Sequence, residues 1–568
     1  MKQNDVDYSI ISSGVTGNGR ILIQRNSGAT GTFFAVGDAT YNGTKGAISA
    51  GKDVNGVENS LLATTIVTGT YVDGNIRILT PDIPASSLSK PRTIPAETAT
   101  KTYTFTPVTS DMVQSFIDQG KYDKAIVALD NLRTLEFYQS QGITDRTLIT
   151  VPELRSVTQI KRFLNAGDIA TGSKSATKSA MIYTFLSDAS LNLFAVTSAS
   201  DVIYKTIPLI DGKYQGVTIL DTVLGFDANL KDRGSEDYKT EGSKLYDLII
   251  SPIKDALALS QVNNLIFSTD KPFRSIPLAA LYNGQANKFL VEDFSSSITP
   301  SFQVIEKDRY RSLKSANVLK MGATEAASDF SPLPSVRTEL ENIARIELQN
   351  SPNIKHSPIY LNKQFSKSNL QALLAKNDSP IIHLATHGVL IRENSDGYIQ
   401  LGTTQSANLT DRQTASEIRQ LDSLQNKDLI VFSACQTVLQ EGNNGYGLAS
   451  AALFAGVKSA IGSHWIISDS GTMVLMTGFY QQLLGNGLSK TKALQEAQKA
   501  MILGKIQVTG VVGTTDKVEL SIDGSKVASS KYGQQNIKAT LVDDYDTQID
   551  KLNHPFYWAA FSLVGNPW

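Results

Sequence analysis

Residues 1–80 alternate short apolar stretches with turns that are rich in Gly, Asn and Thr. The stretches RILIQ, GTFFAVG, TTIVTGTYV and NIRIL have the length and the flanking turn residues of β-strands. Pro81, Pro84, Pro91 and Pro95 follow. Because proline lacks a backbone donor and has a fixed φ, neither a helix nor a central strand is expected there. We therefore predict a β-rich segment over 1–80 and a Pro/Ser-rich linker over 81–109.

From residue 110 the apolar positions follow a helical period. The first stripe comprises Met112, Val113, Phe116 and Ile117, and a second begins at Tyr122, after Gly120. This pattern predicts a helical hairpin over 110–147. Its turn, GKYDKAI, resembles that of a TPR helical repeat. Since at least three such repeats are normally needed to bury their own faces, a lone hairpin packed on the next domain is the alternative.

From about residue 148 strand-like and helix-like segments alternate. Expected strands are AMIYTFL, LNLFAVT, VIYKTIPL, NNLIFSTD, SANVLKMGAT, SPIYLN, PIIHLATHG, DLIVFSACQ and KSAIGSHW, and EGSKLYDLIISPIKDALAL is expected to be one helix. Strands that are apolar throughout, separated by amphipathic helices, predict an α/β fold with a mostly parallel sheet flanked by helices. We divide this region into halves at 148–315 and 316–568. A β-like insertion interrupts the second half at about 505–550.

Composition narrows the class of protein. A chain of 568 residues is too long for a single core, and 41% hydrophobic with 19% charged residues is typical of folded proteins. Lys and Arg (53) nearly balance Asp and Glu (54), which gives no overall field favouring nucleic acid. Apolar runs stay well below the roughly 20 residues of a membrane span, and MKQNDVDYSI lacks a signal-peptide pattern, so we expect a soluble chain. One cysteine excludes an internal disulfide and is compatible with a reducing cytosol.

Two of the predicted strands end in residues that can carry chemistry. IIHLATHG delivers His387 and Gly388, and LIVFSACQT delivers Cys435, 48 residues later (435 − 387). Because parallel strands end at one edge of a sheet, we expect the imidazole and the thiol to stand side by side. A thiol is only a few per cent ionised at neutral pH, so the imidazole would act as its base or hold it as an ion pair. The backbone N–H groups of Gly388 and Cys435 are the expected donors to a tetrahedral oxyanion.

The motifs HLATHG, DLIVFSACQT, GNNGYGLASAALFAGVKSAIGSHW, SDSGTMVLMTGFYQQLL and HPFYWAAFSLVGNPW resemble those of the CHAT family, whose caspase-like domains are often attached to TPR repeats. FSTDKPFRSIPLAALY and LPSVRTELENIA also resemble segments of that family. The resemblance implies a caspase-haemoglobinase fold, a pseudo-protease-like first half, and a dyad at His387 and Cys435. It implies a cysteine endopeptidase that acts on a protein or peptide substrate through a thioester, with no metal or organic cofactor.

The substrate pocket is a weaker part of this interpretation. In separase-like relatives an acidic residue in this general loop receives an arginine, so the resemblance makes Asp469 a candidate for a basic-residue pocket. The alternative is that Ser468, Asp469 or Ser470 caps the helix that begins near Gly471. His464 and Gln436 are further pocket candidates, with a structural role as the alternative for His464. Asp428 begins a strand and is expected to be solvated.

Two rival functions stay open. The dyad could be intact but unused, in a protein-binding scaffold with a caspase-like fold. Alternatively, His383 and His387 could bind zinc, although HLATH lacks the Glu of H-E-x-x-H, and a strand would point His383 into the packing. The insertion could gate the cleft or merely decorate the surface, and the regions before residue 148 could bind or restrain a regulatory protein partner.

The N-terminal segment GTFFAVGDATYNGTKGAISAG resembles Gly-rich β-solenoid modules of secreted, filamentous haemagglutinin-like proteins of cyanobacteria. This resemblance implies that the chain is the C-terminal part of a longer exported product. A cytoplasmic location is the alternative.

Overall fold

The computed structural model describes residues 108–143, 149, 153–170, 177–199, 201–210, 218–305, 310–325, 330–351, 354, 356–376, 378–389, 397–402, 412–438, 447–505 and 552–568, and it gives the backbone of the strands in 1–107 and 506–551. Contacts divide the chain into two compact units, Met1–Thr100 and Lys101–Trp568. The candidate site residues all lie in the second unit.

The first unit consists of short strands, as the sequence predicts. They are β1 (Lys2–Gln3), β2 (Val6–Ile11), β3 (Ile21–Gln24), β4 (Phe34–Ala35), β5 (Ala47–Lys52), β6 (Glu58–Leu61), β7 (Ile66–Val67), β8 (Tyr71–Asp73) and β9 (Ile76–Leu79). They pair into the sheets β1-β2-β5-β6, β3-β9-β8 and β4-β7.

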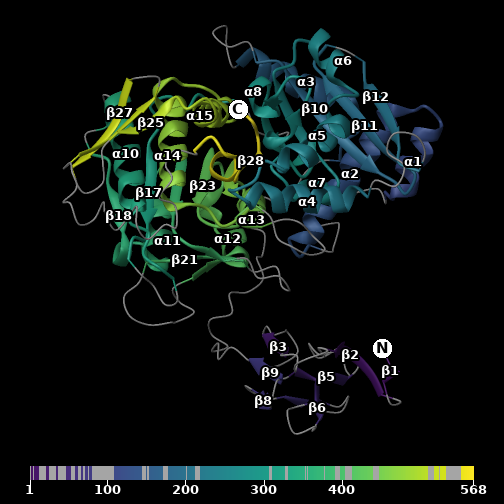
Figure 1. Cartoon of the computed structure of the whole chain (residues 1–568), viewed down its shortest axis with the longest axis horizontal. Coiled ribbons are helices and arrows are strands. Elements are labelled where there is room, and N and C mark those ends of the chain that lie inside the picture. The colour runs from purple at the N-terminus through teal and green to yellow at the C-terminus, as the bar shows by residue number, and fades with distance from the viewer. Residues whose placement is uncertain are drawn as a thin grey trace. The chain divides into compact units, whose positions relative to one another are not determined.

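The second unit is built on an 11-stranded sheet with the order β12-β11-β10-β13-β16-β28-β24-β23-β19-β17-β18 (Figure 1). Its first half contains β10 (Ser179–Leu186), β11 (Ser190–Thr197), β12 (Ile203–Pro208), β13 (Asn264–Ser268) and β16 (Ser295–Ile298). Its second half contains β17 (Val318–Gly322), β18 (Ile359–Leu361), β19 (Ile381–Ala385), β23 (Leu429–Ser433), β24 (Ser459–Ser463) and β28 (Phe561–Gly565).

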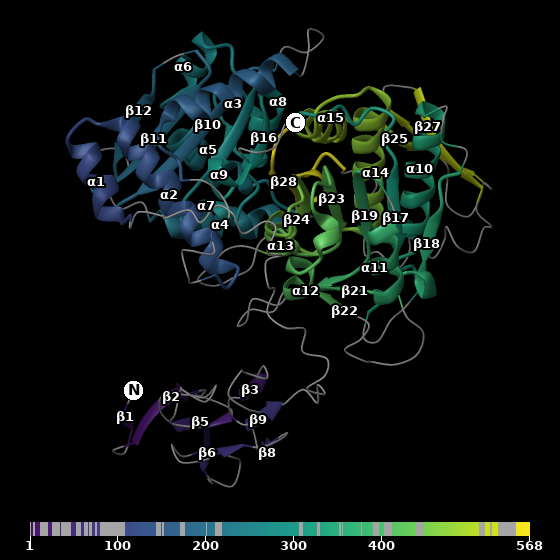
Figure 2. The same cartoon turned by 180° about the vertical axis from the view of Figure 1, so that it is seen from behind.

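Most neighbours in this sheet are parallel. The exceptions are β11, which is antiparallel to both β10 and β12, and β28, which is antiparallel to β24. The two halves meet at β16 and β28, where a single residue pair, Ile298 and Val564, is in register. Figures 1 and 2 show the halves side by side, the first in blue and teal and the second in green to yellow. The predicted α/β class with a mostly parallel sheet is confirmed.

Helices cover both faces of the sheet, which explains why its strands are apolar throughout. One core extends under both halves and includes residues of α4 (Ile219–Lys231), α5 (Tyr238–Ile249), α10 (Ser335–Asn350), α14 (Asp469–Tyr480) and α15 (Lys490–Ile502). The opposite face has two separate cores, one with α1 (Ser110–Asp118), α2 (Tyr122–Ser140) and α3 (Val157–Ala170), the other with α11 (Lys367–Lys376), α12 (Ala415–Arg419) and α13 (Leu448–Phe454). On β19, Ile381 and Ala385 face the shared core, whereas Ile382 and Leu384 face α11–α13.

The α1–α2 hairpin packs on the first half of the sheet through a buried polar surface of α2. Asp130 accepts hydrogen bonds from the Tyr183 hydroxyl (2.9 Å) and the Phe302 N–H (2.6 Å). The end of α2 reaches the second half, where the ring of Tyr138 lies 5.7 Å from that of Phe454 on α13. Helix α2 therefore contacts both halves of the sheet.

Two details differ from the sequence predictions, and a third prediction lies partly outside the described residues. The single helix expected around Pro252 is two helices, α5 and α6 (Lys254–Leu259), because proline cannot continue the hydrogen-bonding of a helix. The insertion contains β25 (Ile506–Thr509), β26 (Lys517–Ile522) and β27 (Ser525–Lys531), while the predicted strand IKATLVDD lies outside the described residues. Asp428 is buried rather than solvated, since Lys458 (2.7 Å) and Arg311 (3.3 Å) pair with its carboxylate.

Shorter elements join these parts. They are α7 (Lys271–Arg274), a 3-10 turn at Leu278–Ala280, β14 (Tyr282–Asn283), β15 (Lys288–Phe289), α8 (Leu290–Asp293), α9 (Phe302–Ile305), β20 (Gly388–Val389), β21 (Tyr398–Gln400), β22 (Arg412–Thr414) and α17 (Pro555–Trp558). Among the described residues, none of the helices is both long and apolar enough to cross a membrane. The predicted domain boundaries near residues 80, 109, 147 and 315 stay predictions.

Candidate active site

The two strands predicted to carry the chemistry are direct neighbours. β19 and β23 run parallel, with Ala385 opposite Ser433, and the Thr386 N–H donates to the Ser433 carbonyl at 3.0 Å. His387 and Cys435 each follow these paired residues by two positions. Because the strands point the same way, both residues emerge at the same edge of the sheet.

Gly388 lies against the backbone of Cys435. A Cβ atom at position 388 would come within 2.2 Å of the Cys435 carbonyl oxygen, so only glycine fits this approach. Gly388 pairs with Ile399 of β21, and the Gln400 N–H donates to the His387 carbonyl at 2.9 Å. In an antiparallel ladder this arrangement makes Gly388 a non-hydrogen-bonded position, whose N–H points away from β21.

The chain turns sharply after Cys435. Gln436 has a φ of +52°, a left-handed conformation that a residue with a side chain adopts only at a cost of about 1 kcal/mol or more. Thr437 is completely buried and holds the turn, since its N–H donates to the Ser463 carbonyl (2.9 Å) and its hydroxyl accepts from the Ser463 N–H (2.9 Å). The Ser463 hydroxyl in turn donates to the Ala434 carbonyl at 2.6 Å. The end of β24 therefore fixes the position of Cys435.

The thiol of Cys435 is half-buried and has two polar neighbours beyond its own strand. Burial raises the pKa of this thiol above its ordinary value, a hydrogen bond from the Ile467 N–H opposes the rise, and the Asp469 carboxylate adds to it. The thiol is therefore protonated at neutral pH in this state.

The imidazole of His387 is held by the segment that precedes α10. Its Nε2 lies 2.7 Å from the Ser331 carbonyl oxygen, and its ring stacks on that of Phe330 with centroids 4.7 Å apart. A carbonyl only accepts hydrogen bonds, so Nε2 carries the proton and Nδ1 is left as the basic nitrogen. Burial lowers the pKa of His387, and the bond to Ser331 partly opposes this.

The imidazole and the thiol are held by different partners in this state. Within the part of the chain that the structure describes, no hydrogen bond joins His387 to Cys435. The raised pKa of the thiol and the lowered pKa of the imidazole both favour a neutral pair over an ion pair. Catalytic hydrogen bonds are often long in ligand-free enzymes and tighten only when substrate binds.

Asp469 acts electrostatically on the thiol and hydrogen-bonds the start of a second helix. Ser468 is the N-cap of α14, because its side chain accepts from the Gly471 N–H at 3.1 Å. Asp469 is the first residue of α14, and its Oδ2 accepts from the N–H of Ser335, the first residue of α10, at 2.8 Å. One carboxylate thus connects the starts of two helices next to Cys435.

His464 follows β24 and is turned toward β28. Its Nε2 lies 2.8 Å from the Ser562 hydroxyl. Burial lowers the pKa of His464 to about 3, so this imidazole is neutral at physiological pH. Its contacts therefore belong to the junction between the two halves of the sheet.

His383 is completely buried on the α10 side of β19, as its strand position predicts. Its Nε2 lies 2.8 Å from the Glu339 carboxylate, and its Nδ1 lies 3.1 Å from the Tyr480 hydroxyl. The Ser433 hydroxyl donates to the same carboxylate at 2.8 Å. No group of three or more His, Cys, Asp or Glu residues that could hold a metal ion occurs among the residues that the structure describes.

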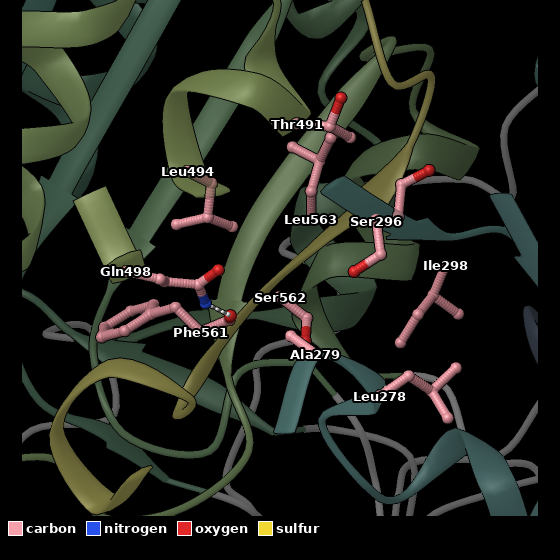
Figure 3. Close-up of a pocket in the computed structure, with 11 residues that line it drawn as sticks. Leu278, Ala279, Ser296, Ile298, Thr491, Leu494, Gln498, Phe561, Ser562 and Leu563 are labelled. Carbon is pink, nitrogen blue, oxygen red and sulfur yellow. Dashed lines mark hydrogen bonds between the residues drawn. The ribbon is translucent and has the colours of Figure 1, made fainter. Parts of the chain in front are cut away.

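A separate pocket lies at the junction of the half-sheets, between the 3-10 turn at Leu278–Ala280, β16, α15 and β28 (Figure 3). Ser296, Ser297 and Ser562 line it, and the Gln498 amide nitrogen, which points to the Phe561 carbonyl, lies 3.4 Å from that oxygen. Its lining contains neither His387 nor Cys435. This pocket is therefore distinct from the dyad.

Sequence reasoning did not find the groups that hold the dyad. The Ser331 carbonyl and the Ile467 N–H are backbone groups. Every residue has a carbonyl and every residue except proline has an N–H, so the sequence does not mark these two positions. Phe330 is one aromatic residue among many. Its contact with His387 depends on how the segment between β17 and α10 folds, which the sequence pattern does not indicate.

Several solved structures align with parts of this chain at low identity. No curated protein matches the sequence. A solved structure of the Saccharomyces cerevisiae separase–securin complex aligns with a TM-score of 0.42 and 10% identity, covering 79% of this chain and 34% of that chain. The Arg-specific cysteine proteinase gingipain R aligns with a TM-score of 0.29 and 13% identity, covering 62% of this chain and 75% of that one. A complex of Porphyromonas gingivalis RgpB pro- and mature domains gives 0.28 and 11%, with 61% and 75% covered.

The chain spans about a third of the length of the separase-complex chain that it matches. Its own sequence provides the family. Residues 239–566, more than half of the chain, match the model of the CHAT domain, and the chain belongs to the CHAT domain family.

Proposed function

We propose that this chain is a caspase-like cysteine endopeptidase in which Cys435 is the nucleophile and His387 the general base. The observation that carries the proposal is the shared sheet edge: β19 and β23 end side by side, and the glycine after His387 packs on the Cys435 backbone. The substrate is a protein or a peptide. The chain's own side chains and backbone are sufficient for this chemistry.

The reaction follows from the tautomer of the imidazole. With its Nε2–H donated to Ser331, the ring accepts the thiol proton on Nδ1 as the sulfur attacks the substrate carbonyl carbon and a C–S bond forms. The imidazolium then gives the proton to the leaving amine, and the C–N bond breaks. Water, deprotonated by the same ring, hydrolyses the thioester and releases the acid product and the free thiol.

The oxyanion of each tetrahedral intermediate needs preorganised donors. The register of β20 directs the Gly388 N–H away from β21, and the Cys435 N–H belongs to the adjacent segment that follows β23. We therefore assign both N–H groups as donors to the oxyanion. Loss of one such donor in other enzymes lowers the rate by about 10²- to 10³-fold.

We assign Asp469 to the pocket for the residue that precedes the cleaved bond. Its carboxylate is close enough to Cys435 to raise the pKa of the thiol, and a positively charged substrate side chain would offset that charge. A basic residue is the expected specificity. Gln436 adjoins the thiol and is a second pocket candidate, whereas the contact of His464 with Ser562 supports a structural role more than a pocket role.

A protein-binding scaffold with an unused dyad is the second candidate. The absence of a hydrogen bond between His387 and Cys435, among the described residues, favours it, as does the protonated thiol. In that case the β-rich segment and the α1–α2 hairpin would bind the protein partner.

The deciding experiment is mass-spectrometric mapping of cleavage sites after incubation with a peptide library. Endopeptidase activity predicts cuts after basic residues, a loss of at least about 10³-fold in Cys435→Ala and in His387→Ala, and no effect of chelators. His356→Ala is the matched control, since His356 is exposed and should leave the rate unchanged. Absence of cleavage by the wild-type chain under all conditions would favour the scaffold, and a rate that survives Cys435→Ala but not chelation would favour zinc.

Alkylation of the chain's one cysteine tests the resting state of the dyad. Because burial raises the pKa of Cys435, the rate of reaction with iodoacetamide should increase with pH through a midpoint above about 8.5. A rate already at its plateau near pH 6 would instead mean a stable thiolate–imidazolium pair.

A further inference from the structure

The His387 ring is contacted on its edge and on its face by consecutive residues. The Ser331 carbonyl accepts from Nε2 at 2.7 Å, while the Phe330 ring lies against the imidazole plane with centroids 4.7 Å apart and an interplanar angle of 20°. The segment is itself held, since the Leu333 N–H donates to the Thr324 carbonyl at 3.2 Å, just beyond β17. The imidazole therefore has a defined orientation before any substrate binds.

We propose that Phe330 is a positioning residue for His387, and that its ring face stabilises the imidazolium that forms when His387 accepts the thiol proton. The inference rests on the proposed endopeptidase function, because only in that reaction does His387 become charged. It adds a side chain to the catalytic arrangement, whereas the Ser331 contact involves backbone alone.

The physical reason is the charge distribution of an aromatic ring. The ring face is negative and its edge positive, so a cation on the face is attracted more strongly than a neutral group in the same place. The neutral imidazole gains mainly packing from Phe330, whereas the imidazolium gains electrostatic attraction as well. Phe330 thus favours the charged form that follows proton transfer, and it also prevents the ring from turning away from Cys435.

Within the described part of the chain, few other charges act at this position. Residues 330–334 contain no titratable side chain, and neither do Gly388 and Val389 of β20. The titratable groups brought to the edge by β23 and α14 are the Cys435 thiol and the Asp469 carboxylate beside it. Burial and the Ser331 carbonyl account for the shift in the pKa of His387, so a change in the Phe330 face should be visible in a titration.

The test compares Phe330→Leu, which keeps an apolar cover but has no π face, with Phe330→Tyr, which keeps the face. In Phe330→Leu we expect the plateau of kcat to fall about two- to fivefold and the acidic limb of kcat/KM to move to lower pH by about half a unit. Phe330→Tyr should match the wild type in both. Simple loss of packing would move the limb to higher pH, because hydration favours the imidazolium.

Histidine NMR separates this inference from the proposed function. The chain has five histidines, and His387→Gln identifies the signal of His387. Its titration midpoint, measured without substrate, should be lower in Phe330→Leu than in the wild type. An unchanged or higher midpoint overturns the role of Phe330 even if the enzyme cleaves peptides, whereas a lower midpoint in a chain that cleaves nothing overturns only the endopeptidase function. Should Phe330→Leu fail to fold, Phe330→Met makes the same comparison.

Discussion

The two halves of the sheet have the same layered construction but treat their strand ends in opposite ways. In the first half, polar groups at the carboxyl edge form hydrogen bonds and an ion pair with one another. Asp270, which follows β13, accepts from Thr184 (2.5 Å), the Leu186 N–H (3.1 Å) and Arg133 of α2 (3.1 Å). Ser268 donates to the Pro300 carbonyl. Helix α2 thus reaches this edge through Arg133, which pairs with the Asp270 carboxylate.

In the second half the corresponding edge carries His387 and Cys435, and both are half-buried rather than covered. Their polar contacts come from backbone groups: the Ser331 carbonyl accepts from Nε2 of His387 and leaves Nδ1 available, and the Ile467 N–H donates to the Cys435 sulfur. At this strand end backbone groups, rather than side chains of a docked helix, make the polar contacts. The pseudo-protease-like role of the first half stays a prediction.

The largest expected effect comes from breaking the covered edge. Asp130 of α2 is completely buried and accepts from Tyr183, the Phe302 N–H and Gln303 (2.9 Å). Asp130→Ala leaves three buried donors without an acceptor and should lower the free energy of unfolding by about 3 to 5 kcal/mol. Urea denaturation followed by tryptophan fluorescence measures the change.

The reactive edge should respond in the opposite manner. Cys435→Ser and His387→Gln change half-buried side chains and should alter the free energy of unfolding by less than about 1 kcal/mol, while cleavage is lost. Equal destabilisation at the two edges would mean that buried polar contacts matter no more to stability in the first half than in the second.

The sequence was sufficient to predict most strands of the large sheet, including the two that precede His387 and Cys435. Strands buried on both faces must be apolar throughout, and this pattern gave β19 and β23 together with the residues at their ends. It failed for β16, whose sequence SSSI is mostly polar although Ser295 and Ser297 are buried. The prediction that Asp428 is solvated was wrong for a related reason. Lys458 and Arg311 pair with its charge, and both lie far away in the sequence.

The orientation of the dyad was less predictable than its identity. Positions 387 and 435 could be named because the topology brings parallel strand ends together. The Ser331 carbonyl and the Ile467 N–H carry no residue-specific signal, and their role depends on where two loops fold. Asp469 has a capping type of side chain, but whether it caps α14 or α10 depends on the packing of those helices.

Glycine substitutions compare the two halves at the level of the backbone. Gly388→Ala places a Cβ against the Cys435 carbonyl, so it should displace an oxyanion donor and lower kcat/KM by about 10²- to 10³-fold. The matched control is Gly225→Ala in α4 of the first half, where the nearest atom to an added Cβ is 3.5 Å away on the Glu241 side chain. It should retain full activity and gain up to about 1 kcal/mol of stability. Wild-type kcat/KM in Gly388→Ala would remove Gly388 from the oxyanion site.

The junction between the halves should respond to acid through His464. Burial lowers its folded pKa to about 3, whereas an unfolded histidine titrates near 6.5. Below pH 6.5 the unfolded chain therefore binds a proton that the folded chain refuses, and stability falls as the pH decreases toward 3. At pH 4.5 this group should cost about 2 to 3 kcal/mol relative to neutral pH.

His464→Gln removes that loss. Its stability, measured by urea unfolding at pH 4.5 and 7.5, should decline less than that of the wild type, with the difference near 2 kcal/mol. Parallel decline in both proteins would mean that His464 is protonated in the folded chain.

The smallest effect concerns the turn at Gln436, and it separates a backbone role from a pocket role. Glycine accepts a φ of +52° without strain, so Gln436→Gly should raise the free energy of unfolding by up to about 1 kcal/mol, while Gln436→Ala keeps the strain and gains nothing. If Gln436 only turns the chain, both variants cleave the preferred peptide with wild-type KM. If its side chain contacts substrate, KM increases equally in both, because both lack the amide. A stability gain without a change in KM would show that the second half carries local backbone strain at the turn after β23, beside the half-buried thiol.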